Sequence, residues 1–371
     1  ITLYHLIFIV KIKIIMKVAI LGDGIVSLTL AKALVNRGIN VHIISDNKKK
    51  IINKSQTIGI TQSNLEFFNK KILNINSLSW KIKNIEIFTE KLANQKILDF
   101  NNNKKTLFSI VKNYQLYNLL NNNLKKNKNF KRKKKLLNNN NYQIIINCDH
   151  NSSVTKKIFY KKIEKSYQSF AYITCIKHKK ISNNNTAIQI FSNFGPIAFL
   201  PISRTETSIV YSIKKNINIT QDKILSLISK YNSRYSIVKI NKIQNFNLIL
   251  SNLRVYHHKN ILAFGDLLHK IHPLAGQGFN MTIRDIKQLL KIINSRIDLG
   301  LEINSTVCLE FEKLTKHNNY LFTSGIDFVY ELFNFESKIK GKNLSKVIQF
   351  LGKNKSLNKF FTKFANEGRI I

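Results

Sequence analysis

Residues 16–46, MKVAILGDGIVSLTLAKALVNRGINVHIISD, decide the fold of this chain. Residues 17–21 form an apolar run that predicts a buried strand, and Gly22-Asp23-Gly24 predicts a tight turn after it. Residues 25–37 have helical periodicity, and residues 41–44 read as the next strand. This order predicts a βαβ unit whose glycines lie where the pyrophosphate of a dinucleotide must approach the backbone.

The glycine pattern departs from its usual form at two places. Ser27 stands where a third glycine is common, and it is small enough for close packing of helix on strand. The acidic residue expected at the end of the second strand falls on Ser45, with Asp46 one step later. Either side chain can reach a ribose hydroxyl, so the unit is still predicted to bind a dinucleotide.

A second stretch, GDLLHKIHPLAGQGFNMTIRD at residues 265–285, adds a different signal. It follows the apolar run 260–264, which reads as a buried strand that ends at Gly265-Asp266. A carboxylate at a strand end can hold a ribityl hydroxyl. The loop beyond Pro273 leads into a helix whose first N–H groups and dipole suit the electron-rich pyrimidine edge of a flavin. The two stretches together predict FAD.

These motifs resemble the flavoprotein aromatic hydroxylases, which have the para-hydroxybenzoate hydroxylase fold. That family has a third motif, Asp-Gly-x-x-Ser-x-x-Arg, which contacts both FAD and the pyridine nucleotide. Asp149 and Ser153 match it, whereas His150 replaces the glycine and Lys156 replaces the arginine. These departures affect the predicted contact with the pyridine nucleotide more than the predicted contact with FAD.

One segment is similar to the ubiquinone-biosynthesis hydroxylases in particular. Residues 185–213 carry the pattern Ala-x-Gln-x-Phe followed by Gly-Pro-x-Ala-x-Leu-Pro. The matching residues are Ala187, Gln189, Phe191, Gly195, Pro196, Ala198, Leu200 and Pro201. Residues 309–333 match the C-terminal helix of that branch.

The resemblance implies an enzyme that uses FAD, NAD(P)H and O2 to hydroxylate a polyprenylated phenol through a flavin hydroperoxide. The implied cofactor residues are Gly22, Gly24, Ser27, Asp46, Gln56, Asp149, Gly265, Asp266, Pro273, Gly276, Gln277, Gly278, Phe279 and Asn280. The implied catalytic residues are Pro273, Gly276 and His272, with the substrate ring between this loop and residues 195–201. No metal is expected, because the His269-x-x-His272 pair has no nearby carboxylate besides Asp266.

Two other functions remain open. A flavoprotein of different chemistry, such as a small-aromatic hydroxylase or a prenyl reductase, would keep the FAD site. A flavin-binding accessory subunit of a quinone-synthesis assembly, without catalysis, would explain the departures at Gln56, His150 and Lys156.

The predicted fold class is α/β. Residues 16–70, 101–158 and 255–305 are expected to form a Rossmann-like FAD-binding domain, with an inserted mixed β-sheet substrate domain from 71–100 and 159–254. Residues 306–371 are expected to be helical, and the low-complexity stretch 121–141 a solvated loop. Residues 1–15 read as a non-native or upstream extension, because the first strand begins directly after Met16.

Composition bounds the partners. The net charge is +40, from 60 Lys+Arg against 20 Asp+Glu. The lysines accompany Asn and Ile throughout, so A- and T-rich codons explain much of the charge. No nucleic-acid motif accompanies the charge, which argues against a nucleic-acid partner, whereas an anionic membrane surface would attract such a protein.

Three scattered cysteines indicate a reducing compartment, and no apolar run reaches the length of a membrane span. We expect a cytoplasmic protein, or one attached peripherally to the inner membrane face.

Overall fold

The structure, a computed structural model, describes residues 16–45, 53–92, 95–101, 106–136, 141–215, 219–273, 276–338 and 346. Three sequence predictions therefore lie outside the described residues. They concern the extension at 1–15, the side chain of Asp46, and the part of the C-terminal region that follows residue 338, apart from residue 346.

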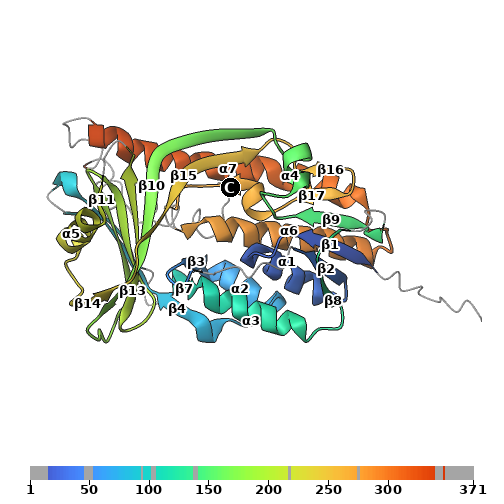
Figure 1. Ribbon diagram of the computed structural model, residues 1–371, viewed down its shortest axis with the longest axis horizontal. Helices are drawn as coiled ribbons and strands as arrows, with labels where there is room; N and C mark the ends of the chain where they lie inside the picture. The colour runs from blue at the N-terminus through green and yellow to red at the C-terminus, as the bar shows by residue number, and fades with distance from the viewer. Residues whose placement is uncertain are drawn as a thin grey trace, which may run out of the picture.

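The predicted βαβ unit lies in a sheet that has six strands within the described residues (Figure 1). In order across the sheet they are β16 (His257–His258), β17 (Ile261–Ala263), β9 (Ile144–Asn147), β1 (Lys17–Leu21), β2 (Asn40–Ile44) and β8 (Phe130–Lys133). β1 pairs in parallel with both β2 and β9, and β9 pairs in parallel with β17. Parallel pairing places the carboxyl ends of β1, β9 and β17 at one edge. The turns after these strands meet there.

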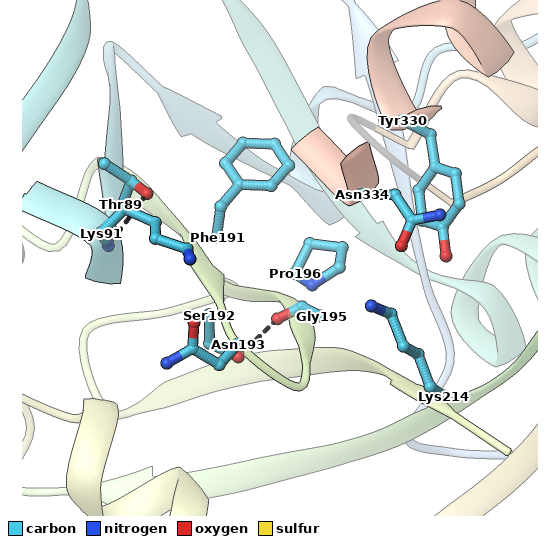
Figure 2. Close-up of a pocket in the computed structure, with 10 residues that line it drawn as sticks. All are labelled: Thr89, Lys91, Phe191, Ser192, Asn193, Gly195, Pro196, Lys214, Tyr330 and Asn334. Carbon is cyan, nitrogen blue, oxygen red and sulfur yellow. Dashed lines mark hydrogen bonds between the residues drawn. The ribbon is translucent and has the colours of Figure 1, made fainter. Parts of the chain in front are cut away.

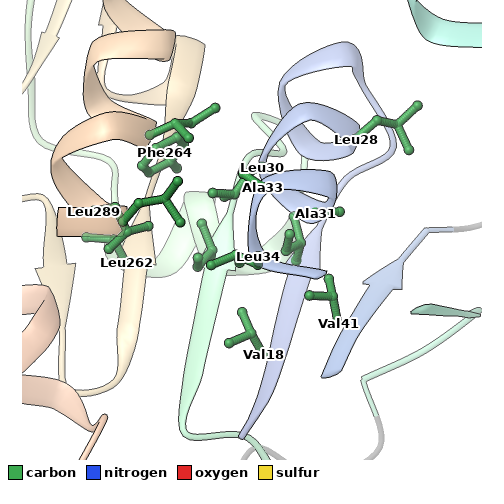
Figure 3. Close-up of a cluster of buried hydrophobic side chains, with 14 of the residues drawn as sticks. Val18, Leu28, Leu30, Ala31, Ala33, Leu34, Val41, Leu262, Phe264 and Leu289 are labelled. Carbon is green, nitrogen blue, oxygen red and sulfur yellow. The ribbon is translucent and has the colours of Figure 1, made fainter. Parts of the chain in front are cut away.

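Helix α1 (Ile25–Val35) is buried along its whole length after its first two residues. Apart from Lys32, its side chains are small or apolar all round, which is the composition of a helix covered on every side. Figure 3 shows Leu30, Ala33 and Leu34 of α1 in one cluster with strand residues and with Leu289 of α6 (Gly278–Asp298). This packing fixes the start of α1 relative to the sheet edge.

A second sheet, of nine strands in the described residues, forms the other end of the molecule (Figure 1). Its strands are β18 (His269–Lys270), β15 (Gln244–Leu253), β10 (Lys162–His178), β13 (Glu206–Lys214), β12 (Gly195–Pro201), β11 (Thr186–Ser192), β5 (Asn84–Thr89), β6 (Gln95–Asn101) and β14 (Ile237–Ile240). Only the β11–β5 pairing is parallel among those described. The expectation of a mixed sheet is confirmed.

A third sheet and several helices connect these parts. The sheet consists of β3 (Thr57–Thr61), β7 (Phe108–Lys112) and β4 (Ser79–Ile82), all antiparallel. The remaining α-helices are α2 (Gln62–Lys71), α3 (Asn113–Lys125), α4 (Ser153–Ile158), α5 (Gln221–Tyr231) and α7 (Ser305–Lys338). Short 3₁₀ turns span Asn76–Leu78, Glu90–Leu92 and Gly265–Leu267. None of the helices described is long and apolar enough to cross a bilayer.

The expectation of a solvated loop at 121–141 is wrong for the stretch from residue 121 to the end of β8 at Lys133. α3 continues to Lys125, and β8 pairs in parallel with β2. Leu120 and Leu124 are fully buried and Phe130 is buried. These few apolar residues anchor a stretch whose Asn and Lys content conceals the helical spacing. Residues 137–140 lie outside the described chain.

Candidate functional site

The turns that follow β1, β9 and β17 converge at one edge of the parallel sheet. A Cβ built on Gly22 would lie 3.2 Å from the Cβ of Asp149. Burial raises the pKa of the Cys148 thiol to about 12, with the nearby carboxylates of Asp266 and Asp149 adding to the shift. The structure therefore brings together three of the sequence motifs that predicted FAD.

The β1–α1 turn leaves room for a ligand. Gly22 has a φ of +101°, so glycine suits its backbone as well as its close approach to Asp149. Gly24 is the N-cap of α1, has no capping side chain, and has no atom within 4 Å of an added Cβ. The first N–H groups of a helix have no partner within the helix. Here they lie beside open space, where the pyrophosphate of FAD fits.

The end of β2 supplies a second polar group. The Ser45 hydroxyl is buried and has no hydrogen-bond partner in the part of the chain that the structure describes. Buried hydroxyls are normally satisfied. A ribose hydroxyl at this strand end would satisfy it, and the assignment of the ribose to Ser45 or Asp46 stays a prediction.

Asp266 and Gly265 begin a 3₁₀ turn directly after β17. The carboxylate of Asp266 is exposed, whereas Gly265 is buried with a φ of +66°. A Cβ on Gly265 would lie 2.5 Å from Cγ1 of Val26 in α1. The glycine thus lets the turn touch α1, and the carboxylate stays available to a ribityl chain.

A cavity of about 310 Å³ lies where the nine-stranded sheet and the three-stranded sheet meet Pro273 and the start of α6. Its walls are mostly apolar. They are formed by Thr57, Gly59, Thr61, Ile85, Ile87, Phe100, Leu107, Phe108, Ala187, Ile188, Gln189, Ala198, Leu200, Val210, Pro273, Gly276, Gln277 and Asn280. The cavity has the size of a small-molecule site. It joins the predicted flavin loop to the predicted substrate strands.

Two polar atoms in the cavity wall fit a flavin ring. Oε1 of Gln277 and Oγ1 of Thr61 are buried, and neither has a hydrogen-bond partner within the described residues. An isoalloxazine ring offers an apolar face together with polar edge atoms that could pair with such groups. The cavity therefore fits the cofactor that the sequence predicted.

Asn280 has a structural function in addition to lining the cavity. Its Oδ1 accepts hydrogen bonds from the Thr61 amide (2.9 Å) and from Nδ2 of Asn64 (3.0 Å). Its Nδ2 donates to the carbonyl oxygens of Gly59 (2.9 Å) and Gly276 (3.2 Å). The side chain ties the start of α6 to the β3–α2 junction.

The two histidines of the loop point into the protein rather than into the cavity. His272 stacks on Tyr330 with ring centroids 4.3 Å apart, and it does not line the cavity. Burial lowers the pKa of His272 to about 3, so it is neutral at physiological pH. Nε2 of His269 donates to Asp285 at 2.7 Å, and Asn319 of α7 holds the other oxygen of Asp285. The structure thus gives the loop histidines packing partners.

Four other predicted cofactor residues lie at or behind the site. Ser27 is buried in α1, and the ring of Phe279 packs 6.5 Å from that of Phe68. Gln56 precedes β3, and its Oε1 accepts a hydrogen bond of 3.3 Å from Asn113. Gly278 begins α6 and has open space around it.

The sequence analysis missed the β3 wall of the cavity. Thr57, Gly59 and Thr61 line it, while Ile58 and Ile60 between them are buried. Alternation of small polar and apolar residues is the signature of a strand with one face on a cavity. The signal was present in the five-residue stretch TIGIT.

A smaller hollow lies between the β11–β12 turn and α7. Figure 2 shows Lys91 and Lys214 on either side of Gly195 and Pro196, where Ser192 Oγ donates to the Gly195 carbonyl (2.6 Å). Its volume is about 30 Å³, which leaves room for only a few water molecules. It is too small for a substrate.

Comparison with known proteins supports the same chemistry. No protein-family model matches the chain. It is 24% identical over 234 residues to the mitochondrial ubiquinone biosynthesis monooxygenase of Xenopus tropicalis, covering 52% of this chain and 50% of that protein. It is 29% identical over 153 residues to the 3-demethoxyubiquinol 3-hydroxylase of Escherichia coli, covering 39% of each. The chain thus spans about half the length or less of these curated relatives.

Solved structures match over more of the chain. The p-nitrophenol 4-monooxygenase of Pseudomonas putida has a TM-score of 0.77 at 12% identity, covering 95% of this chain and 98% of that one. A probable FAD-dependent monooxygenase of Pseudomonas aeruginosa has a TM-score of 0.68 at 12% identity, covering 90% and 99%. The fold is that of the FAD-dependent monooxygenases. The predicted fold class is confirmed, and so is the resemblance to ubiquinone-biosynthesis hydroxylases.

Proposed function

We propose that the chain is an FAD-dependent monooxygenase that hydroxylates the aromatic ring of a polyprenylated phenol in ubiquinone biosynthesis. The observation that carries the proposal is the 310 Å³ cavity between residues 273–280 and strands β11 and β12. Bound FAD would supply oxygen activation. The chain's own groups would hold the cofactor and keep the reacting ring away from water.

Each proposed contact follows from the local geometry. The first turn of α1 would receive the pyrophosphate, Ser45 the adenosine ribose, and Asp266 the ribityl chain. Gly276, Gln277 and their neighbours to Asn280 would hold the pyrimidine edge, and Pro273 would cover the ring face. The apolar wall from β5, β6 and β12 excludes water from the substrate. We keep the division into a discontinuous FAD domain, an inserted sheet domain and a C-terminal helical region as part of this proposal.

FAD binding is tested first. The full chain is titrated with FAD, and the dissociation constant is taken from the quenching of flavin fluorescence. Gly24→Val would fill the open space at the start of α1, so we expect at least about tenfold weaker binding with an unchanged circular dichroism spectrum. A wild-type chain that takes up no FAD would overturn the proposal.

The reaction is tested by deleting the gene and identifying the quinone precursor that is no longer hydroxylated. Deletion of the corresponding gene should cause a quinone precursor that lacks one ring hydroxyl to accumulate, as identified by mass spectrometry. Oxidation of NADH and NADPH by the purified flavoprotein tests the reductant, because His150 and Lys156 replace the glycine and arginine of the family motif. A yellow protein that oxidises neither nucleotide and causes no accumulation would favour an accessory subunit of a quinone-synthesis assembly.

We also propose peripheral attachment to an anionic bilayer, the phase in which a polyprenylated substrate dissolves. Leu314, Leu321, Phe328 and Phe335 recur every seventh residue on α7, and all four are exposed, the two phenylalanines by about 60%. The net charge of +40 would attract the surface. Phe328→Ser should reduce co-sedimentation with phosphatidylserine vesicles. Equal sedimentation of the two proteins, or none of the wild type, would contradict attachment through α7.

A further inference from the structure

One ion pair at the cofactor edge was not expected from the sequence. Asp23 is the middle residue of the Gly22-Asp23-Gly24 turn, and its Oδ2 lies 2.7 Å from Nη1 of Arg132 in β8. The hydroxyl of Tyr117 in α3 donates to the other carboxylate oxygen at 3.3 Å. The side chains of Asp23 and Arg132 are 17% and 23% exposed. Water therefore screens this pair less than it would a surface pair.

The Arg132 side chain is held from two other directions. Its Nη2 donates to Oδ1 of Asn121 in α3 at 2.8 Å. Its guanidinium carbon lies 5.8 Å from the ring centroid of Phe130, on the same strand face. The planar guanidinium is thus fixed toward the β1–α1 turn rather than toward solvent.

Asp23 creates an electrostatic problem for the proposed function. A pyrophosphate at the start of α1 would bring two negative charges beside a carboxylate, and like charges in a partly dry site repel. The favourable field of the helix N-terminus would be offset by that carboxylate. A neighbouring cation removes the conflict.

We propose that Arg132 is a positioning residue for the dinucleotide, which acts by neutralising Asp23 so that the β1–α1 turn accepts the pyrophosphate of FAD. The inference rests on the proposed FAD site. It assigns a function to the lysine-rich stretch 121–136 and treats Arg132 and Asp23 as one unit, in which the carboxylate suits the site only while the guanidinium neutralises it.

The test is a double-mutant cycle read by FAD affinity. Arg132→Gln should weaken FAD binding about tenfold or more, because Asp23 is then unpaired beside the phosphates. Asp23→Asn in the Arg132→Gln background should restore binding to within about threefold of wild type, because the turn is again neutral. Arg132→Lys should retain most of the affinity, since the charge is kept.

Lys131→Gln is the matched control, because it removes the same charge from the neighbouring, exposed position of β8. It should change FAD affinity by less than about twofold. Thermal unfolding of the apoproteins shows whether each variant is folded. If Arg132→Gln does not fold, Arg132→Lys and the double variant still complete the comparison with Asp23→Asn.

The outcomes separate this inference from the proposed function. Wild-type protein that binds no FAD would overturn both. Wild-type binding with no loss in Arg132→Gln would overturn only the inference. A loss that Asp23→Asn fails to restore would also overturn it, since Arg132 would then act by something other than neutralising Asp23.

Discussion

Residues 265–280 contain two halves with opposite surroundings. In the first half, Gly265 touches α1, His269 binds Asp285 and His272 stacks on Tyr330. In the second half, Pro273 and Gln277 line the cavity. The first half therefore fixes the loop to the protein, and the second presents it to a ligand. Apart from the exposed Asp266, which is assigned to the ribityl chain, substitutions in the first half should change stability. Substitutions in the second half should change FAD binding.

Gly265→Ala should have the largest effect on stability. The added Cβ would lie 2.5 Å from Val26 in a backbone of positive φ, so strain and overpacking combine to about 3 to 5 kcal/mol. Urea denaturation of the apoprotein measures the loss. Gly300→Ala is the control, because Gly300 has a φ of +67° and nothing within 4 Å. Gly300→Ala should lower the free energy of unfolding by only about 1 kcal/mol. Equal losses in the two variants would show that contact with Val26 does not add to the cost at Gly265.

Asn280 belongs to both groups of residues, because it lines the cavity and its side chain also makes hydrogen bonds within the protein. Asn280→Ala would leave the Thr61 amide and the Gly59 carbonyl without their partner. We expect a loss of about 2 to 4 kcal/mol in the free energy of unfolding, even without FAD. Asn280→Asp keeps the acceptor but places a buried carboxylate against the Gly59 and Gly276 carbonyl oxygens, so its loss should be at least as large. If Asn280→Ala lowered the free energy of unfolding only when FAD is present, Asn280 would act mainly by contacting the ligand.

His272 should make stability fall in acid. Its pKa is about 3 in the folded chain against an ordinary 6.5, so between these values only the unfolded chain binds the proton. Its contribution is complete above about pH 6.5 and is lost as pH falls toward 3, by about 2 kcal/mol between pH 6 and 4. His272→Phe keeps a ring beside Tyr330 and should show a shallower decline in urea denaturation. An unchanged slope would exclude His272 as its source.

Gln277→Leu should have the smallest effect on stability in the series. Its Oε1 lacks a partner among the described residues, so replacing the amide by an apolar group should leave the apoprotein within about 1 kcal/mol of wild type. FAD affinity, measured by fluorescence quenching, should fall about tenfold because a ligand hydrogen bond is lost. Weaker stability with unchanged affinity would contradict the assignment of Gln277 to the ligand-facing half.

Patterns within short stretches of sequence predicted most of the elements around the proposed FAD site. The run 17–21 matches β1 and the helical stretch 25–37 matches α1, because each pattern is contained in consecutive residues. The cavity was predicted on two sides, from the loop that includes Pro273 and Gly276 and from residues 195–201. Ile85 and Phe100 reach it because β5 pairs with β11, a contact between residues distant in sequence. The Asp23–Arg132 pair depends in the same way on β8 pairing with β2, inside a stretch whose composition suggested no structure.

Strand β10 belongs to both ends of the molecule. Residues 162–166 pair with the part of β15 that leads to β17, and residues 169–177 pair with β13 of the far sheet (Figure 1). Between them the register shifts near Gln168, whose φ is +48°. β10 is one strand of 17 residues that carries both sets of pairings. Loss of the hydrogen bonds between β10 and β15 should therefore also weaken those between β10 and β13. Heating should therefore melt the two ends together in one calorimetric transition, as in a single cooperative unit.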